Sequence, residues 1–329
     1  MVIGYLARRL GAAVVLLFVL SAIIFFLQSI SPGDPVKAFL GANAPRAAVE
    51  AERHRLGLDQ PAIVQFGRFL LGIAQGNLGM SFRTHRPVVS DLATYLPATI
   101  ELVVTAFILA LLLATLFAFS AALRWRGSSV YRGVLLVGAT APAFLLAIGG
   151  IILFYQQLGW LPASGQGPDD PGPTGFLLLD TLAHGDGAGF ADTLAHLLLP
   201  ALVLSIAPAI GIGRILRSSL EATLSADYVR TARSKGLREG RVLLKHVLRN
   251  SIGPALSMAG LQLGFMFAGV VVVEQVFSWP GIGNYLANSI PVSDFPAIAG
   301  VTLVLGTIYI LTNTAVDLLQ AAADPRIVA

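Results

Sequence analysis

The residues that could hold a nucleotide phosphate or cleave a bond lack the spacing that such chemistry requires. A P-loop places a lysine directly after a glycine, so that the ammonium group reaches the phosphates. Lys37, Lys235 and Lys245 are the only lysines in the chain, and none of them follows a glycine. The five histidines form no H-E-x-x-H motif, and no G-x-S-x-G motif is present. We therefore expect no catalytic residue, no resident cofactor and no metal ligand.

Three acidic side chains lie in or beside long apolar runs: Glu101, Glu274 and Asp317. All three fall near the ends of these runs, whereas acids buried at mid-membrane depth mark proton relays. A proton-driven carrier is therefore disfavoured. Glu274 allows two interpretations. It is either an interfacial acid in water, or a buried acid that pairs with another helix or lines a path near its external mouth.

A strongly basic segment, 226–254, separates two apolar runs. Its bases are Arg230, Arg233, Lys235, Arg238, Arg241, Lys245 and Arg249, and its acids are Asp227 and Glu239. We predict a short helix over 226–235, capped by Ser225, with an acid in its first turn and bases in its last turn. Gly236 is suited to end this helix in a left-handed turn.

A second helix is expected to start at Glu239 and to lie along the membrane surface before the next span. Its apolar residues form a helical stripe, and Arg241, Lys245 and Arg249 share the opposite face. Physically, the segment is either an interfacial hairpin that carries positive-inside charge or a knob that fits a groove on a soluble partner. Charge alone does not decide between the two.

Composition places these elements in a membrane. Of the 329 residues, 55% are hydrophobic and 12% are charged, and the mean hydropathy is +0.76. Soluble domains carry about twice that charged fraction. The net charge of +4 is clustered, so it indicates membrane topology rather than nucleic-acid binding. The chain has no cysteine, which excludes disulfides and thiolate sites.

Uncharged windows long enough to cross the hydrocarbon predict six membrane spans. They are 10–33, 102–123, 133–168 with its apolar part ending near Tyr155, 193–213, 250–273 and 295–316. We expect Pro200 and Pro208 to kink the fourth. The first is too long for a signal peptide and is taken as an uncleaved helix. With the N-terminus inside, most of the 22 basic residues fall inside, so both termini are predicted to be cytoplasmic.

Two external segments are expected. The first, 31–97, is predicted to be a small helical subdomain with helices over 47–55, 63–76 and 88–96, the last stopping near Pro97. The second, 157–192, is rich in Gly and Pro and carries five aspartates. It is either a solvated, mobile loop or an acidic rim that faces a partner. Trp279, within a predicted turn at 278–283, fits an interfacial belt. The resulting division is 1–30, 31–97 and a core at 98–329.

Motifs along the whole chain resemble one family of transport proteins. R-T-A-R-S-K-G-L at 230–237 and H-x-L-R-N at 246–250 resemble the EAA loop of ABC-importer membrane subunits, in the dipeptide, oligopeptide and nickel branch. The further matches are Y-L-A-R-R-L at 5–10, P-G-D-P at 32–35, L-G-L-D-Q-P at 56–61, G-N-L-G-M-S-F at 76–82, L-P-A-T-I-E-L at 96–102 and V-F-S-W-P-G-I-G at 276–283. The general pattern has glutamate at Arg230 and alanine at Thr231, so this chain departs from it there.

The resemblance implies a type I importer permease that forms half of a translocation pathway in the inner or plasma membrane. Its implied partners are a homologous second permease, two cytoplasmic ATPase subunits that bind ATP and Mg²⁺, and an extracytoplasmic solute-binding protein. Within a coupling loop at 214–254, the residues implied to contact an ATPase are Asp227, Tyr228, Arg230, Thr231, Ala232, Lys235, Gly236 and Leu237. Candidate path-lining residues are Gln262, Glu274 and Asn313.

Several alternatives stay open on these grounds. The cargo implied by the branch is a dipeptide or oligopeptide, but a nickel chelate or haem also fits it. A secondary transporter or channel, with the basic segment as a lipid-facing hairpin, is the competing class. An intramembrane protease lacks a paired nucleophile or carboxylate set. Dependence of uptake on ATP hydrolysis separates the first two classes.

Overall fold

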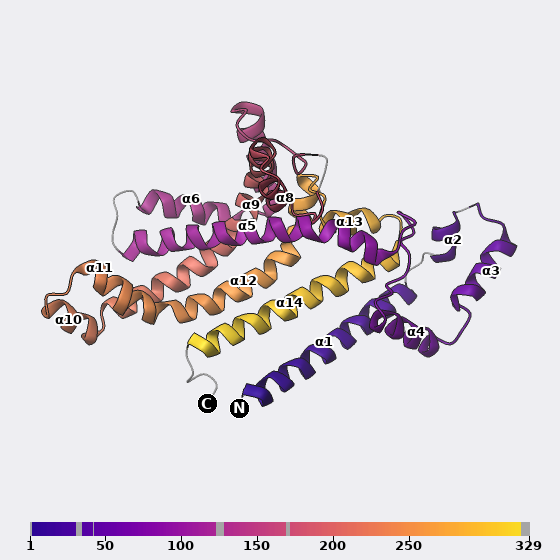
Figure 1. Ribbon diagram of the computed structural model, residues 1–329, viewed down its shortest axis with the longest axis horizontal. Coiled ribbons are helices and arrows are strands. Elements are labelled where there is room, and N and C mark those ends of the chain that lie inside the picture. Colours follow the sequence, from indigo (N-terminus) through magenta and orange to yellow (C-terminus); the bar gives the residue numbers. More distant parts are fainter. Residues whose placement is uncertain (1, 31–34, 42, 123–127, 169–171, 324–329) are drawn as a thin grey trace.

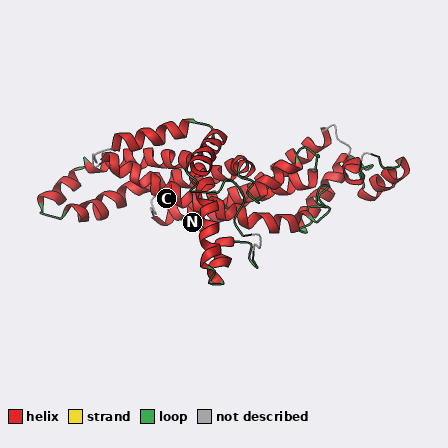
Figure 2. Cartoon of the chain, turned by 90° about the horizontal axis from the view of Figure 1, so that it is seen from above, coloured by secondary structure: helices red, strands yellow, loops and turns green. Residues whose placement is uncertain are grey.

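The computed structural model describes residues 2–30, 35–41, 43–122, 128–168 and 172–323, and every regular element within them is a helix (Figures 1 and 2). An isolated antiparallel bridge joins Met80 to Pro87. The prediction of an all-α membrane protein is confirmed. Asp169, Asp170 and Arg326, together with parts of the predicted first and second spans and of the P-G-D-P motif, lie outside the described residues.

Within the described residues, five helices are long and apolar enough to cross a membrane. They are α1 (Val2–Ile30), α5 (Val88–Ala122), α9 (Gly187–Leu224), the continuous helix Glu239–Val276 that ends in α12 (Arg249–Val276), and α14 (Phe295–Ala323). These correspond to the first, second, fourth, fifth and sixth predicted spans. Hydropathy located them because a membrane span is required to be apolar over about 20 residues, whatever its neighbours are.

The predicted third span is broken rather than continuous. It consists of α6 (Ser128–Thr140) and of α7 (Ala143–Gly150), which continues as the π-helix η1 (Ile151–Gln157), with a bend of 117° between them. Pro142 stands at the break and directly precedes α7. Proline disfavours helical geometry in the residue before it and lacks the N–H that a continuing helix needs. The described residues therefore contain up to six spans if this bent pair counts as one.

Other prolines do not interrupt their helices. α5 runs through Pro97, so the predicted stop there is wrong, and α9 is continuous through Pro200 and Pro208. α9 has 38 residues, far more than the predicted 193–213. At 1.5 Å per residue it is about 57 Å long, roughly twice the thickness of the hydrocarbon. It is therefore long enough to extend beyond the hydrocarbon.

α9 is the centre of the packing. It lies between α5 and α12, and α12 in turn packs against α14 and the short helix α13 (Ile282–Ser289). The main core cluster includes Leu102, Leu197, Val270 and Trp279, all fully buried. α1 packs against α14 at the edge of the bundle. Trp279 is buried, and its indole N–H donates to the carbonyl of Ala98 at 2.9 Å, so the prediction of an interfacial tryptophan is wrong.

The two ends of the long axis carry different elements (Figure 1). At one end lie α2 (Pro35–Leu40), α3 (Arg46–Leu56) and α4 (Ala62–Ala74), of which α3 and α4 match the predicted helices. The ring of Phe66 in α4 contacts Phe18 and Phe25 of α1, with centroids 5.8 and 5.3 Å apart. The opposite end is formed by α10 (Asp227–Ser234), held on the ends of α9 and α12.

The described parts of 157–192 are anchored and do not form a free loop. They include α8 (Leu177–Ala183), and Asp180 in this helix is buried and accepts hydrogen bonds from the backbone and hydroxyl of Thr174. Glu101 of α5 accepts the N–H of Leu178 at 2.8 Å and the amide of Gln166 at 3.2 Å. Gly172 and Gly175 have positive φ, and the turns they make let the described part of the segment pack on α5, a contact that composition alone does not reveal.

Candidate functional site

A hairpin over residues 226–248, formed by α10 and the start of the helix that begins at Glu239, contains all eight residues predicted to contact an ATPase. α10 follows α9 after a bend, and its N-cap is Ala226. The predicted cap is wrong, because the hydroxyl of Ser225 donates instead to the carbonyl of Ala222 in the preceding helix, at 2.8 Å. The first turn carries Asp227, as predicted, and its negative charge suits the positive end of the helix dipole.

Gly236 ends α10 in the predicted way. Its φ of +75° lies in the left-handed region that favours glycine. Its N–H donates to the carbonyl of Arg233 at 2.9 Å, and the N–H of Leu237 reaches the carbonyl of Ala232 at 3.4 Å. These bonds satisfy the last carbonyls of the helix and reverse the chain direction.

The second helix of the hairpin differs from the prediction. It does start at Glu239, but it runs on without a break from α11 (Glu239–Arg241) through the π-helix η2 (Val242–Leu248) into α12. It is therefore the extended end of a span and not a separate surface helix. An ion pair ties the two arms together, because Arg233 donates to both carboxylate oxygens of Glu239, at 2.5 and 3.2 Å.

One face of the hairpin is buried against the spans. Val229 and Ala232 of α10 pack with Val242 and Val247 of η2 in a cluster that includes Leu216 and Leu220 of α9. Leu237 packs against the same cluster. Nearby, the hydroxyl of Ser251 in α12 lies 2.9 Å from the hydroxyl of Thr223 in α9. The hairpin is thus fixed to α9 and α12.

The other face is exposed. Asp227, Tyr228, Arg230, Thr231, Lys235 and Gly236 are all on the surface, whereas Ala232 is buried and Leu237 is half-buried. Of the eight predicted contact residues, six therefore have atoms that a partner could reach, and Ala232 and Leu237 anchor the hairpin instead. The Tyr228 side chain is 47% exposed. Exposed aromatic side chains of this kind are enriched among residues that dominate binding energy in protein interfaces.

The structure does not bring the three predicted path residues together. Glu274 is fully buried and accepts the Thr99 hydroxyl at 2.6 Å and the Asn284 N–H at 2.9 Å. It therefore lies inside the chain, away from any surface that a solute could touch, and its interpretation as an acid bound to another helix is the one that fits. Gln262 lies about 18 Å away along α12.

Gln262 and Asn313 are both half-buried but reach different neighbours. The amide nitrogen of Gln262 lies 2.4 Å from where a Cβ on Gly211 of α9 would be. Asn313 of α14 donates its amide to the carbonyl of Tyr309 at 3.0 Å and lies beside Gly264 of α12. Within the part of the chain that the structure describes, no three His, Asp or Glu side chains gather in a way that could hold a metal ion.

Sequence reasoning missed a polar network at the end of the bundle opposite α10. Thr99 donates to Glu274 and accepts the N–H of Ile282 at 2.9 Å, which joins α5, α12 and α13. Farther out, Asp294 accepts the Ser81 hydroxyl at 2.5 Å. The motifs at 96–102 and 276–283 contain Thr99 and Ile282, so both partners were visible in the sequence, but their contact was not.

Comparisons with known proteins match the chain over nearly its full length. The family model "Binding-protein-dependent transport system inner membrane component" matches residues 106–329, and the N-terminal model for the same kind of membrane component matches residues 2–103. The di/tripeptide transport system permease protein of Pseudomonas aeruginosa is 41% identical over 99% of this chain and 98% of that protein. A probable D,D-dipeptide transport system permease protein of Escherichia coli is 40% identical, over 98% and 96%. The glutathione transport system permease protein of Escherichia coli is 35% identical, over 99% of each.

Proposed function

Because the chain belongs to the family of binding-protein-dependent transport system inner membrane components, we propose that it is the permease subunit of an ATP-driven importer of short peptides. The relatives reported above are named for di- and tripeptides, D,D-dipeptides and glutathione, which is itself a tripeptide. Peptides of two or three residues are therefore the proposed cargo. The chain is a membrane permease and not an enzyme.

One observation supports energy entry at α10. The hairpin has a buried face fixed to α9 and α12 and an exposed face that carries Tyr228, Arg230 and Thr231. Since α9 is about 57 Å long, α10 sits beyond the hydrocarbon, where a soluble protein can reach it. A movement of the exposed face would be passed to both α9 and α12. The buried face packs against both helices, the Arg233–Glu239 ion pair ties the two arms of the hairpin together, and the second arm continues into α12 without a break.

The proposed complex contains this chain, a homologous second permease, two ATPase subunits and an extracytoplasmic solute-binding protein. ATP and Mg²⁺ would bind the ATPase subunits, since this chain has no P-loop lysine. The peptide would cross between the two permeases, with Gln262 and Asn313 as candidate polar groups on the path. Both termini are assigned to the cytoplasmic side of the inner or plasma membrane on the distribution of basic residues.

The substitution Tyr228→Ala tests the assignment of α10. In vesicles that contain the complete complex, we expect ATP-dependent uptake of a labelled dipeptide to fall about tenfold or more, because a tyrosine at the centre of an interface contributes about 2 kcal/mol. The chain should still insert and still purify with the second permease, since Tyr228 is not part of the buried cluster. Peptide uptake and ATP hydrolysis are measured in the same vesicles.

Tyr155→Ala is the matched control, because it makes the same truncation at a similarly exposed tyrosine, 51% against 47%, on η1 and outside the hairpin. It should leave peptide uptake coupled to ATP hydrolysis. Uptake at the normal rate in Tyr228→Ala would show that α10 is not the coupling element. Dipeptide uptake that needs no ATP hydrolysis in the unaltered complex would instead indicate a secondary transporter or channel.

A further inference from the structure

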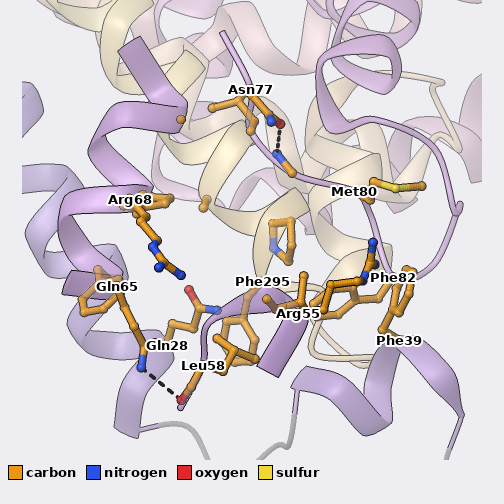
Figure 3. A pocket seen from close by; sticks show the side chains of 18 of the residues that line it. Gln28, Phe39, Arg55, Leu58, Gln65, Arg68, Asn77, Met80, Phe82 and Phe295 are labelled. Atoms are coloured by element: carbon orange, nitrogen blue, oxygen red, sulfur yellow. Dashed lines mark hydrogen bonds between the residues drawn. The ribbon is translucent and has the colours of Figure 1, made fainter. Parts of the chain in front are cut away.

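A cavity of about 790 Å³ (Figure 3) lies where α2–α4 meet the membrane-spanning helices, and Figure 1 shows α2–α4 at the end of the molecule opposite α10. Five helices and the segment 77–82 line it. Cavities of about 300–1,000 Å³ are of the size that holds a small organic ligand. None of the eight predicted coupling residues and none of the three candidate path residues belongs to its lining.

The lining places the cavity at the boundary between hydrocarbon and water. Gln28 and Ser29 belong to the last turn of α1, and Phe295 and Pro296 begin α14. Both helices are membrane spans, so their ends mark the level at which the chain leaves the hydrocarbon. A ligand in this cavity would therefore be at the depth of lipid headgroups.

Arg68 supplies a cation that no described residue neutralises. Its side chain extends from α4 into the cavity toward Gln28 (Figure 3), and it makes no hydrogen bond or ion pair within the described residues. Arg55, which also lines the cavity, is different, because it donates to both carboxylate oxygens of Glu52, at 2.5 and 2.8 Å. Guanidinium groups bind phosphate through two parallel hydrogen bonds, which makes Arg68 suited to a phosphate group.

Aromatic and aliphatic side chains supply much of the remaining lining, beside polar residues that include Glu52, Arg53 and Gln65. Phe25 of α1 and Phe69 of α4 lie with ring centroids 6.2 Å apart, and Phe39 and Phe82 form a second pair at 5.9 Å. The outer surface of α4 is also apolar, with Ile63 76% exposed and Leu71 58% exposed. A short helix with exposed apolar residues and a basic side chain is typical of helices that lie in the membrane interface.

We propose that this cavity binds an anionic phospholipid, with the phosphate at Arg68 and the first part of the acyl chains against Phe25 and Phe69. A cation and an apolar surface side by side match the two halves of such a molecule. At this depth the bilayer itself provides the ligand. The bound lipid would fill the space that α1, α2–α4 and α14 enclose and would hold α2–α4 against the spans. The proposal is independent of the ATPase partners and of the peptide cargo.

Binding of lipid to the purified full chain by native mass spectrometry tests the site. The probes are phosphatidylglycerol, which is anionic, and phosphatidylcholine, which is zwitterionic. We expect the first phosphatidylglycerol to bind more tightly, with a lower dissociation constant, than the first phosphatidylcholine. Arg68→Gln should weaken phosphatidylglycerol about fivefold, as one basic residue near an anionic headgroup does. Phosphatidylcholine binding should change less.

Arg46→Gln is the control, because it removes the same charge from the surface of the neighbouring helix α3, outside the cavity lining. Arg68 is exposed, so both variants should unfold at the same temperature as the unaltered chain. Equal loss of phosphatidylglycerol binding in both variants, or no loss in Arg68→Gln, would overturn the proposal. Displacement of the lipid by alanyl-alanine would also overturn it and would assign the cavity to peptides.

Discussion

Glu274 stabilises the fold, although an acid within an apolar helix of a transporter would suggest contact with the solute. Its carboxylate joins α12 to Thr99 of α5 and to Asn284 of α13, and it is fully buried. We expect Glu274→Ala to lower the free energy of unfolding by about 2–5 kcal/mol, because it leaves the buried Thr99 hydroxyl and the Asn284 N–H without this acceptor and opens a cavity. The midpoint of thermal unfolding in detergent measures this loss.

Gln275→Ala is the control for this prediction. Gln275 is the next residue on α12 and is exposed, so its truncation should change stability by no more than about 0.5 kcal/mol. If Glu274→Ala unfolded at the same temperature as Gln275→Ala but transported peptide poorly, the carboxylate would have a role in transport and not in the fold.

At the scale of elements, two glycines decide how closely α12 approaches α14. A Cβ on Gly260 would lie 2.3 Å from a methyl carbon of Val316, and one on Gly264 would lie 2.7 Å from the ring of Tyr309. This spacing of small residues lets membrane helices pack backbone to backbone. We expect Gly260→Ala to destabilise the chain by about 1–3 kcal/mol, because the Cβ of Val316 itself would lie 2.7 Å from the added carbon, so rotating the valine side chain does not relieve the contact. Thermal unfolding in detergent measures it.

Gly253→Ala makes the same change on the same helix where nothing lies within 4 Å of the added carbon. It should be neutral or stabilising by up to about 1 kcal/mol, because alanine favours a helix over glycine. If the two variants shifted the unfolding temperature equally, helix propensity rather than the contact with α14 would explain both. A large loss in Gly260→Ala alone supports the close packing.

At the scale of the whole molecule, local requirements were predictable and contacts between distant segments were not. The spans, Gly236 and the start of the second arm at Glu239 were predicted because each follows from a few adjacent residues. Pro97 and Pro142 have the same local chemistry, yet the helix continues through the first and breaks before the second. Tertiary packing decides between these outcomes. The burial of Trp279 depends on Ala98, which lies 181 residues earlier in the chain.

The arrangement of the two ends of the molecule yields a prediction about topology. α10 and the α2–α4 end lie at opposite ends of the long axis, with membrane spans between them (Figure 1). Because the chain has no cysteine, a single introduced cysteine is the only thiol that can react. In intact cells, a membrane-impermeant maleimide should label Asp59→Cys, between α3 and α4, but not Ser234→Cys in α10.

Both positions are exposed, so burial does not explain a difference between them. In cells that make the permeases without the ATPase subunits, which would cover α10, Ser234→Cys should react as fast as Asp59→Cys once the membrane is opened. The reverse pattern in intact cells would place the basic hairpin outside and remove α10 from the reach of a cytoplasmic ATPase.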